Sequence, residues 1–290
     1  ASARCLRVLL LIQESLTSLV VLPANVELVH EGQRTPHFDV VCPLLSLPHL
    51  LGPNLPGTDA LNIPQSIPYL KLDQARSAAW EGRFTAPGLP VSLRVGLVWA
   101  GNPSHKNDAN RSLEFSALAP LLAVEGVQFY SFQVGARSAD LDTLSPELRA
   151  RVVDLSPDLK DFGDTAAALA HVDVLVCVDT SICHVAGALG IPVWLLLPWM
   201  PDWRWLLERE DSPWYPSLRI LRQPRYRDWE SVVATLTRDV KELAQPHSAG
   251  GRRRHASAHA LVEQGRVLLE RNEPALAAPA FWHALRECPT

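Results

Sequence analysis

The hydrophobic pattern of the chain is strongest between residues 172 and 198. Val172–Val178 is a run of Val and Leu long enough to form a strand that is buried on both faces. Asp179–Ser181 interrupts this run with residues that favour the start of a helix. A small apolar segment, Cys183–Leu189, then predicts a helix, and a glycine and a proline separate it from a second buried strand at Val193–Leu197. The pattern predicts a strand–helix–strand unit with a polar tip after its first strand.

Buried strands alternate with helices over the whole of residues 92–245, and no hairpin signal interrupts them. This alternation predicts a doubly wound α/β domain with a parallel sheet. Besides the unit above, the expected strands are Leu93–Trp99, Val127–Gln133, Val152–Leu155 and Leu218–Leu221, and the expected helices are Leu113–Val124, Leu141–Leu148, Thr165–His171 and Trp229–Ala244.

Residues 1–85 predict a smaller and less regular α/β unit. Prolines recur through residues 42–70 and exclude long regular elements there, and such a connection suggests a functional or interdomain segment. The apolar start of the chain is compatible with a signal peptide, but a strand is favoured because no clean cleavage site follows. The expected strands are Leu6–Ile12, Val26–Val29 and His37–Val41, and the expected helices are Glu14–Leu22 and Lys71–Phe84.

The last 45 residues differ from the rest. Residues 246–255 combine a glycine pair with three arginines and predict a linker. Residues 256–290 predict a helical hairpin at the spacing of one tetratricopeptide repeat, which must dock on something else because one repeat cannot bury its own face. The positions that carry this pattern are Leu261, Gly265, Leu268, Ala277, Phe281, Ala284 and Pro289.

Composition narrows the class of protein. A formal net charge of −4 excludes a strongly basic nucleic-acid binder, so no nucleic-acid partner is expected. No apolar run approaches the ~18 residues of a membrane span. Five scattered cysteines lack disulfide or metal spacing, and Cys177 and Cys183 fall in apolar segments. Buried free thiols in a reducing compartment are the expected state, which indicates a cytoplasmic protein.

Polar residues follow two of the predicted strands. The loop at 99–111 places Gly101 and Asn102 in a turn and adds positive charge at Lys106 and Arg111, as a diphosphate site requires. The alternative is an ordinary exposed polar loop. The spacing of glycine and lysine in the loop at 99–111 is not that of a phosphate-binding Walker loop.

The tip at Asp179, Thr180 and Ser181 opens a helix whose free N–H groups favour an anion. Asp179 is itself an anion, so it suits sugar hydroxyls or helix capping better than phosphate. His184 lies in the first turns of that helix, where a core histidine is the alternative. Gln133, after another strand, is a candidate contact to a base or ribose, and an ordinary turn is the competing interpretation.

Four of the nine tryptophans lie between residues 198 and 215. Aromatic faces stack on bases and sugars, so Trp203 and Arg204 are candidate contacts to either. A surface loop folded over the domain is the alternative. Glycine-rich dinucleotide fingerprints, the G-x-S-x-G motif and Cys/His metal spacing are absent from the sequence. These absences weigh against a nicotinamide dehydrogenase, a serine hydrolase and a zinc enzyme.

The sequence resembles the tetratricopeptide-linked bacterial glycosyltransferases, which are similar to the heptosyltransferases (family 9) and more distantly to the O-linked GlcNAc transferases. The resemblance spans roughly residues 6–244 and is carried by the segments VGLVWAGNPSHKNDANRS, FYSFQVG, DVLVCVDTSICHVAGALGIPVWLLLP and DWRWLLEREDSPWYPSLRILRQ. It implies a GT-B fold, in which two Rossmann-like domains face each other across a cleft, with the C-terminal domain binding the donor.

The resemblance also implies roles for individual residues. Lys106 matches a lysine that lies against donor phosphate and sugar, and Gln133 falls in the region that contacts the nucleoside. Asp179, Thr180 and Ser181 match a donor-binding D-T-G tip, with Ser in place of Gly, and His184 matches the histidine that follows.

The family's first strand–helix turn, which carries the acidic candidate base, is not found, and Leu6–Ile12 looks like the second strand of that domain. The N-terminal domain is therefore expected to be partial and the catalytic base is unassigned, although Glu14 lies near a strand end.

The expected function is transfer of a sugar from a nucleoside-diphosphate sugar, without metal or other cofactor, to an unknown protein or glycan acceptor. The alternative is a weak or inactive transferase-like scaffold that contacts a protein partner through its repeat. An α/β oxidoreductase is a third and poorer interpretation.

Overall fold

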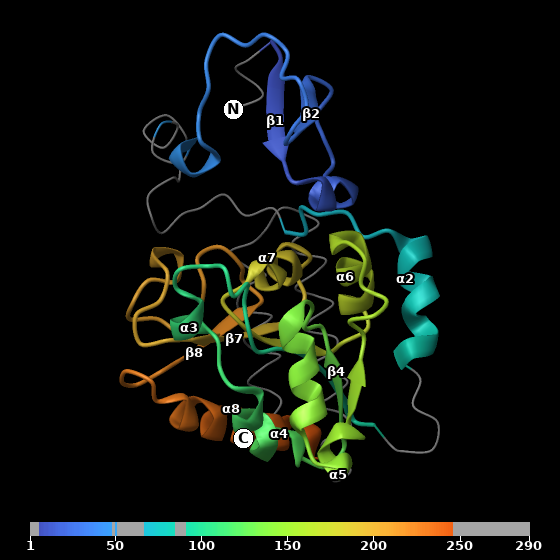
Figure 1. The fold of residues 1–290 in the computed structure, drawn as a ribbon, viewed down its shortest axis with the longest axis vertical. Coiled ribbons are helices and arrows are strands. Elements are labelled where there is room, and N and C mark those ends of the chain that lie inside the picture. The colour runs from blue at the N-terminus through green and yellow to red at the C-terminus, as the bar shows by residue number, and fades with distance from the viewer. Residues whose placement is uncertain (1–5, 48–49, 51–66, 85–90, 246–290) are drawn as a thin grey trace.

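The computed structural model describes residues 6–47, 50, 67–84 and 91–245. The predicted linker at 246–255, the predicted tetratricopeptide hairpin at 256–290 and most of the proline-rich segment lie outside the described residues. Figure 1 shows a small lobe that carries β1 and β2 above a larger α/β body.

The body is built on a parallel six-stranded sheet with the order β5-β4-β3-β6-β7-β8. This is the doubly wound order, in which the chain starts at a central strand, winds outward in one direction, and then returns to wind in the other. The strands are β3 (Leu93–Val98), β4 (Val127–Ser131), β5 (Val152–Asp154), β6 (Val174–Val178), β7 (Val193–Leu197) and β8 (Leu218–Arg222).

Alternation of side chains along each strand divides the core into two clusters. Leu175 and Cys177 of β6 face the side that α6, α7 and α2 cover, whereas Val174 and Val176 face the side that α4 and α8 cover. Every residue of β6 and of β7 is buried, as expected for strands covered on both faces. The helices are α2 (Gln74–Trp80), α3 (Asp108–Arg111), α4 (Ala119–Leu122), α5 (Pro146–Arg149), α6 (Phe162–Leu169), α7 (Ser181–Ala188) and α8 (Trp229–Ala244).

Two predicted helices are wrong as single elements. The segment 113–124 forms a 3₁₀ helix, η6 (Phe115–Leu118), followed by the one-turn α4, which has a proline in its first turn. The segment 141–148 is divided between η7 (Ala136–Thr143) and α5, which Ser145 caps and a proline opens. In both cases the proline lacks the N–H that would continue the preceding helix.

The small lobe holds two parallel strands, β1 (Val8–Ile12) and β2 (Val26–His30), joined through the 3₁₀ helix η2 (Glu14–Leu19). The expected strand at His37–Val41 is wrong: this segment is irregular, and Val40 and Val41 are more than 80% exposed. In Figure 1 the arrow of β1 points toward the body, so the carboxyl end of β1 lies on the side facing the body. The helix η2 follows this end and begins at Glu14.

Two buried glutamines tie neighbouring strand ends together. Gln133, just past β4, accepts from the backbone N–H groups of Trp99 and Ala100 at 3.1 and 2.9 Å. Gln223, just past β8, accepts from the N–H groups of Trp199 and Arg227, both at 3.1 Å. The chain therefore leaves β3 and β7 at points that side-chain amides hold.

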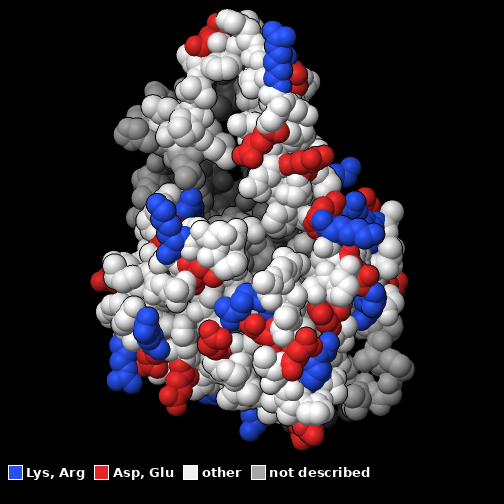
Figure 2. All heavy atoms as spheres, in the orientation of Figure 1, with Lys and Arg blue, Asp and Glu red and all other residues white. Residues whose placement is uncertain are grey.

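Figure 2 shows Lys and Arg side chains interspersed with Asp and Glu on the face in view, and a hollow between the upper lobe and the body. Within the described part of the chain, no helix combines the length and apolar character needed to cross a bilayer.

Candidate functional site

The predicted site lies where the winding of the sheet reverses, at the carboxyl ends of β3 and β6. These strands are parallel neighbours, with Val98 opposite Cys177. The segment after β3 leads to Phe115 in one core cluster, whereas α7 after β6 places Ile182 in the other. The two connections therefore separate to opposite faces, and in open α/β sheets the crevice left between them is where ligands bind.

Arg111 joins the two loops. Its Nη1 donates to the carbonyl oxygen of Asp179 at 2.8 Å, and its Nε lies 3.2 Å from Oδ1 of Asp108. The Arg111 side chain is 15% exposed and that of Asp108 is 11% exposed, so this ion pair is largely shielded from water. Arg111 thus holds the tip against the cationic loop.

Gly101 leaves the space in this loop that Arg111 and Asp108 occupy. A Cβ at this position would lie 2.4 Å from Nη2 of Arg111 and 2.4 Å from Oδ1 of Asp108. The backbone N–H of Gly101 donates to Oγ of Ser112 at 2.9 Å, so this group already has a partner. The role of Gly101 in this structure is to leave room for the Arg111 side chain.

Asn102 and Lys106 lie on the exposed part of the loop. Oδ1 of Asn102 accepts from the N–H of Ser104 at 2.9 Å, which is a local turn interaction. Lys106 is exposed, and among the described residues its ammonium forms no ion pair. Of the predicted cationic residues of this loop, Lys106 is the one whose charge is left for a ligand.

Gln133 has no amide group left to offer. It is 3% exposed, its Oε1 accepts from two backbone N–H groups, and its Nε2 donates to the carbonyl of Ala100 at 3.1 Å and that of Val134 at 3.3 Å. The predicted contact to the nucleoside would require these bonds to break. In this structure Gln133 positions the loop instead.

The tip itself is organised around the start of α7. Thr180 is the N-cap residue with extended backbone, but its side chain makes no capping hydrogen bond. Its buried Oγ1 has no hydrogen-bond partner within the described part of the chain. Ser181, the first residue of α7, is exposed. The tip therefore presents the free end of a helix next to an unpaired hydroxyl.

His184 is held by residues that the sequence did not single out. Its Nδ1 lies 2.9 Å from the hydroxyl of Tyr215, and its ring stacks on Trp205 at 5.3 Å with an interplanar angle of 18°. Burial lowers the pKa of His184, while Asp179 acts in the opposite direction. The lowered pKa favours the neutral imidazole.

Both aromatic partners of His184 come from the tryptophan-rich segment, for which the sequence predicted contacts to a base or sugar, with a surface loop as the alternative. Trp205, in the middle of that segment, and Tyr215, at its end, are both buried. The high density of aromatic residues in this segment was the signal that could have indicated Trp205 and Tyr215. Residue spacing could not show that they contact His184.

Asp179, Cys183 and His184 form a compact group of possible metal ligands. One ligand atom from each lies within 4.8 Å of the others. Cys183 also faces Cys177, and burial raises the pKa of the Cys177 thiol well above its usual value. Cys177 and Cys183 are both buried free cysteines, as predicted.

Trp203 and Arg204 lie beside the tip on the loop after β7. Trp203 is 60% exposed, and the guanidinium carbon of Arg204 lies 4.9 Å from the centre of the Trp203 ring. Nη1 of Arg204 also pairs with Oδ1 of Asp202 at 2.7 Å. A cavity of about 530 Å³ is lined by Trp203, Asp202 and neighbours. Nδ2 of Asn110 donates to the carbonyl of Met200 at 3.2 Å, so this loop also contacts the cationic loop.

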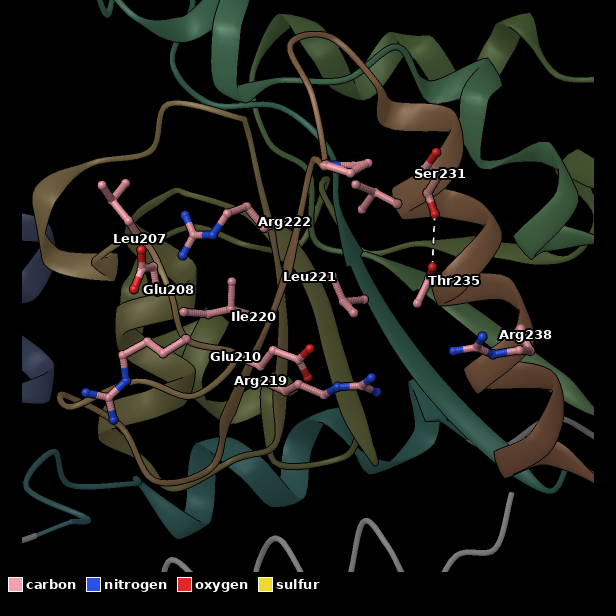
Figure 3. A pocket seen from close by; sticks show the side chains of 13 residues that line it. Leu207, Glu208, Glu210, Arg219, Ile220, Leu221, Arg222, Ser231, Thr235 and Arg238 are labelled. Atoms are coloured by element: carbon pink, nitrogen blue, oxygen red, sulfur yellow. Dashed lines mark hydrogen bonds between the residues drawn. The ribbon is translucent and has the colours of Figure 1, made fainter.

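A second cavity, of about 490 Å³, lies at the edge strand β8 (Figure 3) and not at the predicted site. Its arginines are mostly paired with carboxylates: Arg219 and Arg238 share Asp239, and Arg209 pairs with Asp211. Because β8 is two strands away from β6 and these charges are balanced, we do not assign this cavity to the site.

Residues 61–196 match the family described as glycosyltransferase family 9 (heptosyltransferase). The match contains both loops of the site, Lys106 and the Asp179–Ser181 tip, and it confirms the resemblance to heptosyltransferases over these residues. It supports sugar transfer as the class of activity.

Two individual proteins are also similar. Protein FlbA of Caulobacter vibrioides is 32% identical over 189 residues, which cover 62% of this chain and 30% of FlbA. The E. coli ADP-heptose lps heptosyltransferase II structure aligns with a TM-score of 0.41 and 18% identity, over 60% of this chain and 53% of that chain. The chain thus spans about a third of FlbA and about half of the E. coli chain.

Proposed function

We propose that this protein transfers a sugar from a nucleoside-diphosphate sugar to an acceptor, and that the donor binds between the loop at 99–111 and the tip at 179–181. The match to glycosyltransferase family 9 supports the class of reaction. The observation that carries the location is the hydrogen bond from Arg111 to the carbonyl of Asp179, because it joins the two loops into one site.

In this proposal the diphosphate is bound by charge and by backbone dipoles. Lys106 supplies an unpaired ammonium, and the N-terminus of α7 supplies free N–H groups with a favourable dipole. The unpartnered hydroxyl of Thr180 provides a further donor. The Asp179 carboxylate would repel phosphate, so we assign it to sugar hydroxyls. Trp203 is the proposed stacking surface for the base or a sugar ring.

The experiment that tests the site is calorimetric titration of nucleoside diphosphates and their ADP-, UDP- and GDP-linked sugars. Lys106→Ala and Asp179→Ala should each weaken binding about tenfold or more, since each removes a charged or charge-assisted contact. Lys241→Ala, at an exposed position in the last turn of α8, is the matched control and should bind normally. Unchanged binding in both site variants would refute the location.

The scaffold interpretation has one observation in its favour. The small lobe exposes apolar side chains, including Leu11 at 61% and Val40 at 83%. These exposed side chains are available for a contact with another protein. Measurable turnover of a nucleotide sugar by the chain would rule out a purely structural role, whereas binding without turnover would favour the scaffold.

A further inference from the structure

Three side chains from separate parts of the chain form a line of hydrogen bonds that ends at His184. The hydroxyl of Tyr69 donates to the hydroxyl of Tyr215 at 3.5 Å, and the hydroxyl of Tyr215 lies 2.9 Å from Nδ1 of His184. Tyr69 is half exposed, while Tyr215 is 6% exposed. The line therefore runs from the surface to the buried side of the imidazole.

The position of Tyr215 is fixed by packing against α7. A Cβ at Gly187 would lie 2.4 Å from Cγ of Tyr215, so the ring occupies the space that this glycine leaves open. Tyr215 also meets the His184 ring edge-on, with centroids 5.7 Å apart. The hydroxyl is thus aimed at Nδ1 by a ring that has little freedom to move.

The position of Tyr69 is fixed by the backbone. Its N–H donates to the carbonyl of Ala188, the last residue of α7, at 3.1 Å. Two residues later, the N–H of Lys71 donates to the carbonyl of Leu19 in η2, at 3.3 Å. The short segment that carries Tyr69 therefore contacts both the small lobe and the helix of the candidate site.

The direction of the hydrogen bonds determines where the imidazole proton lies. The Tyr215 oxygen accepts from Tyr69, and Nδ1 of His184 is the acceptor that lies against the Tyr215 hydroxyl. Tyr215 is 6% exposed, and a buried phenol proton without an acceptor would cost free energy, so Tyr215 donates to Nδ1. Burial raises the pKa of Tyr215 far above its usual value, which keeps the hydroxyl protonated. A neutral imidazole that accepts at Nδ1 carries its proton on Nε2. The charged groups that act on His184 are Asp179, Arg204 and Asp202.

We propose that Tyr215 is a positioning residue that fixes His184 in the Nε2–H tautomer, so that the imidazole presents a hydrogen-bond donor to the donor diphosphate. Because Nδ1 is occupied, Nε2 is the nitrogen left for a ligand. Tyr69 orients the Tyr215 hydroxyl and links this arrangement to the segment that contacts the small lobe. The proposal rests on the proposed function for the identity of the ligand, but the tautomer itself does not.

The tautomer is measured on the free protein by long-range ¹⁵N–¹H correlation spectra of ¹⁵N-histidine-labelled samples, with the His184 signals assigned by their loss in His184→Asn. The native chain should show a protonated Nε2 and an unprotonated Nδ1. Tyr215→Phe keeps the ring against Gly187 and removes only the hydroxyl, so the spectrum should shift toward a mixture of tautomers. Tyr226→Phe, at a tyrosine that is 62% exposed, is the matched control and should leave it unchanged.

Binding of a nucleotide sugar is then measured for the same variants. Tyr215→Phe should weaken it about tenfold, Tyr69→Phe by less, and Tyr226→Phe not at all. An unchanged tautomer in Tyr215→Phe overturns the proposal. A changed tautomer with unaltered affinity also overturns it, because the hydrogen bond between Tyr215 and His184 would then have no role in ligand binding. If the native chain binds no nucleotide sugar, the proposed function fails, while the tautomer result still decides the assignment to Tyr215.

Discussion

Arg111 donates to the backbone carbonyl of Asp179 across the junction of two parallel strands, at a distance of 2.8 Å. The same guanidinium pairs with Asp108 three residues before it, and both side chains are largely buried. A loop that would otherwise depend on local turns is thereby fixed to the start of α7.

Replacing Arg111 by Met should damage both stability and ligand binding. The change leaves the buried Asp108 carboxylate without its partner and removes the hydrogen bond to the Asp179 carbonyl. Because unpairing a buried charge is costly, the free energy of unfolding should fall by at least about 3 kcal/mol. Nucleotide-sugar affinity should fall with it. Urea unfolding and calorimetry give the two numbers. Arg7→Met breaks the ion pair with Glu27, whose side chains are 55% and 50% exposed, and it should cost under about 1 kcal/mol. Equal losses in the two variants would contradict the assigned role.

Gly101→Ala should displace the Arg111 side chain from its position against Asp108 and Asp179. The added methyl would lie 2.4 Å from both Nη2 of Arg111 and Oδ1 of Asp108, so both side chains must move. We expect a loss of about 1–3 kcal/mol in unfolding free energy, in the range of overpacking substitutions. Gly82→Ala is the control, because a Cβ there meets nothing within 4 Å and its backbone is not left-handed. If both glycine variants unfold at the same denaturant concentration, the close approach at Gly101 is not decisive.

The ion pair between Arg76 of α2 and Asp161, the N-cap of α6, should make stability depend on acid. Burial acts to raise the pKa of Asp161, but the hydrogen bond from Arg76, 2.6 Å away, and the N–H groups of α6 outweigh it and lower the pKa. A lowered folded-state pKa gives stability that is present above about pH 4 and is lost as pH falls through the folded value.

Asp161→Asn retains a capping side chain and removes the charge, so it isolates the ion pair from the cap. Because both side chains are about a third exposed, the difference from the native chain should be about 1 kcal/mol or less at pH 7. Thermal unfolding between pH 7 and pH 2.5 should show this difference shrinking toward the acidic end. A difference that stays constant across the range would mean that Asp161 acts only through the cap.

Chelation should leave donor binding unchanged, because the proposed site stabilises the diphosphate with Lys106 and backbone N–H groups. Calorimetry with and without EDTA tests this. Added Zn²⁺ is the informative counterpart, since Asp179, Cys183 and His184 offer it three ligand atoms within 4.8 Å of one another. If these residues accept the ion, Zn²⁺ should weaken donor binding in the native chain and not in Cys183→Ser. Affinity that requires a divalent ion would refute the metal-independent proposal.

The hydrophobic pattern was sufficient to predict most of the fold of the body. Val193–Leu197 and Trp229–Ala244 have the predicted bounds, because a continuous apolar run and a capped amphipathic helix are determined by local sequence. The strand predicted at His37–Val41 is not formed, because a strand is not determined by local sequence alone. Its apolar residues suit a strand, but pairing depends on a neighbouring strand that local pattern does not reveal.

The candidate site was predictable only in outline. That loops after β3 and β6 meet follows from the sheet topology, which the alternation of elements indicates. What each polar side chain does depends on distances that spacing does not contain. Gln133 was predicted to contact a nucleoside, but its amide holds the end of β3. Tyr215 lies 31 residues from His184, and this separation gives no indication that the two side chains are in contact.

The paired glutamines restrict how the molecule can respond to a ligand. Gln133 holds the backbone as far as Ala100, and Gln223 holds it at Trp199, each through a side-chain amide that is almost completely buried. Any closure of the two loops over a bound sugar must therefore hinge beyond these anchor points, while the strands remain in place. Under the proposed function, such an arrangement lets the loops change their sequence, and with it the ligand that they bind, without disturbing the sheet beneath them.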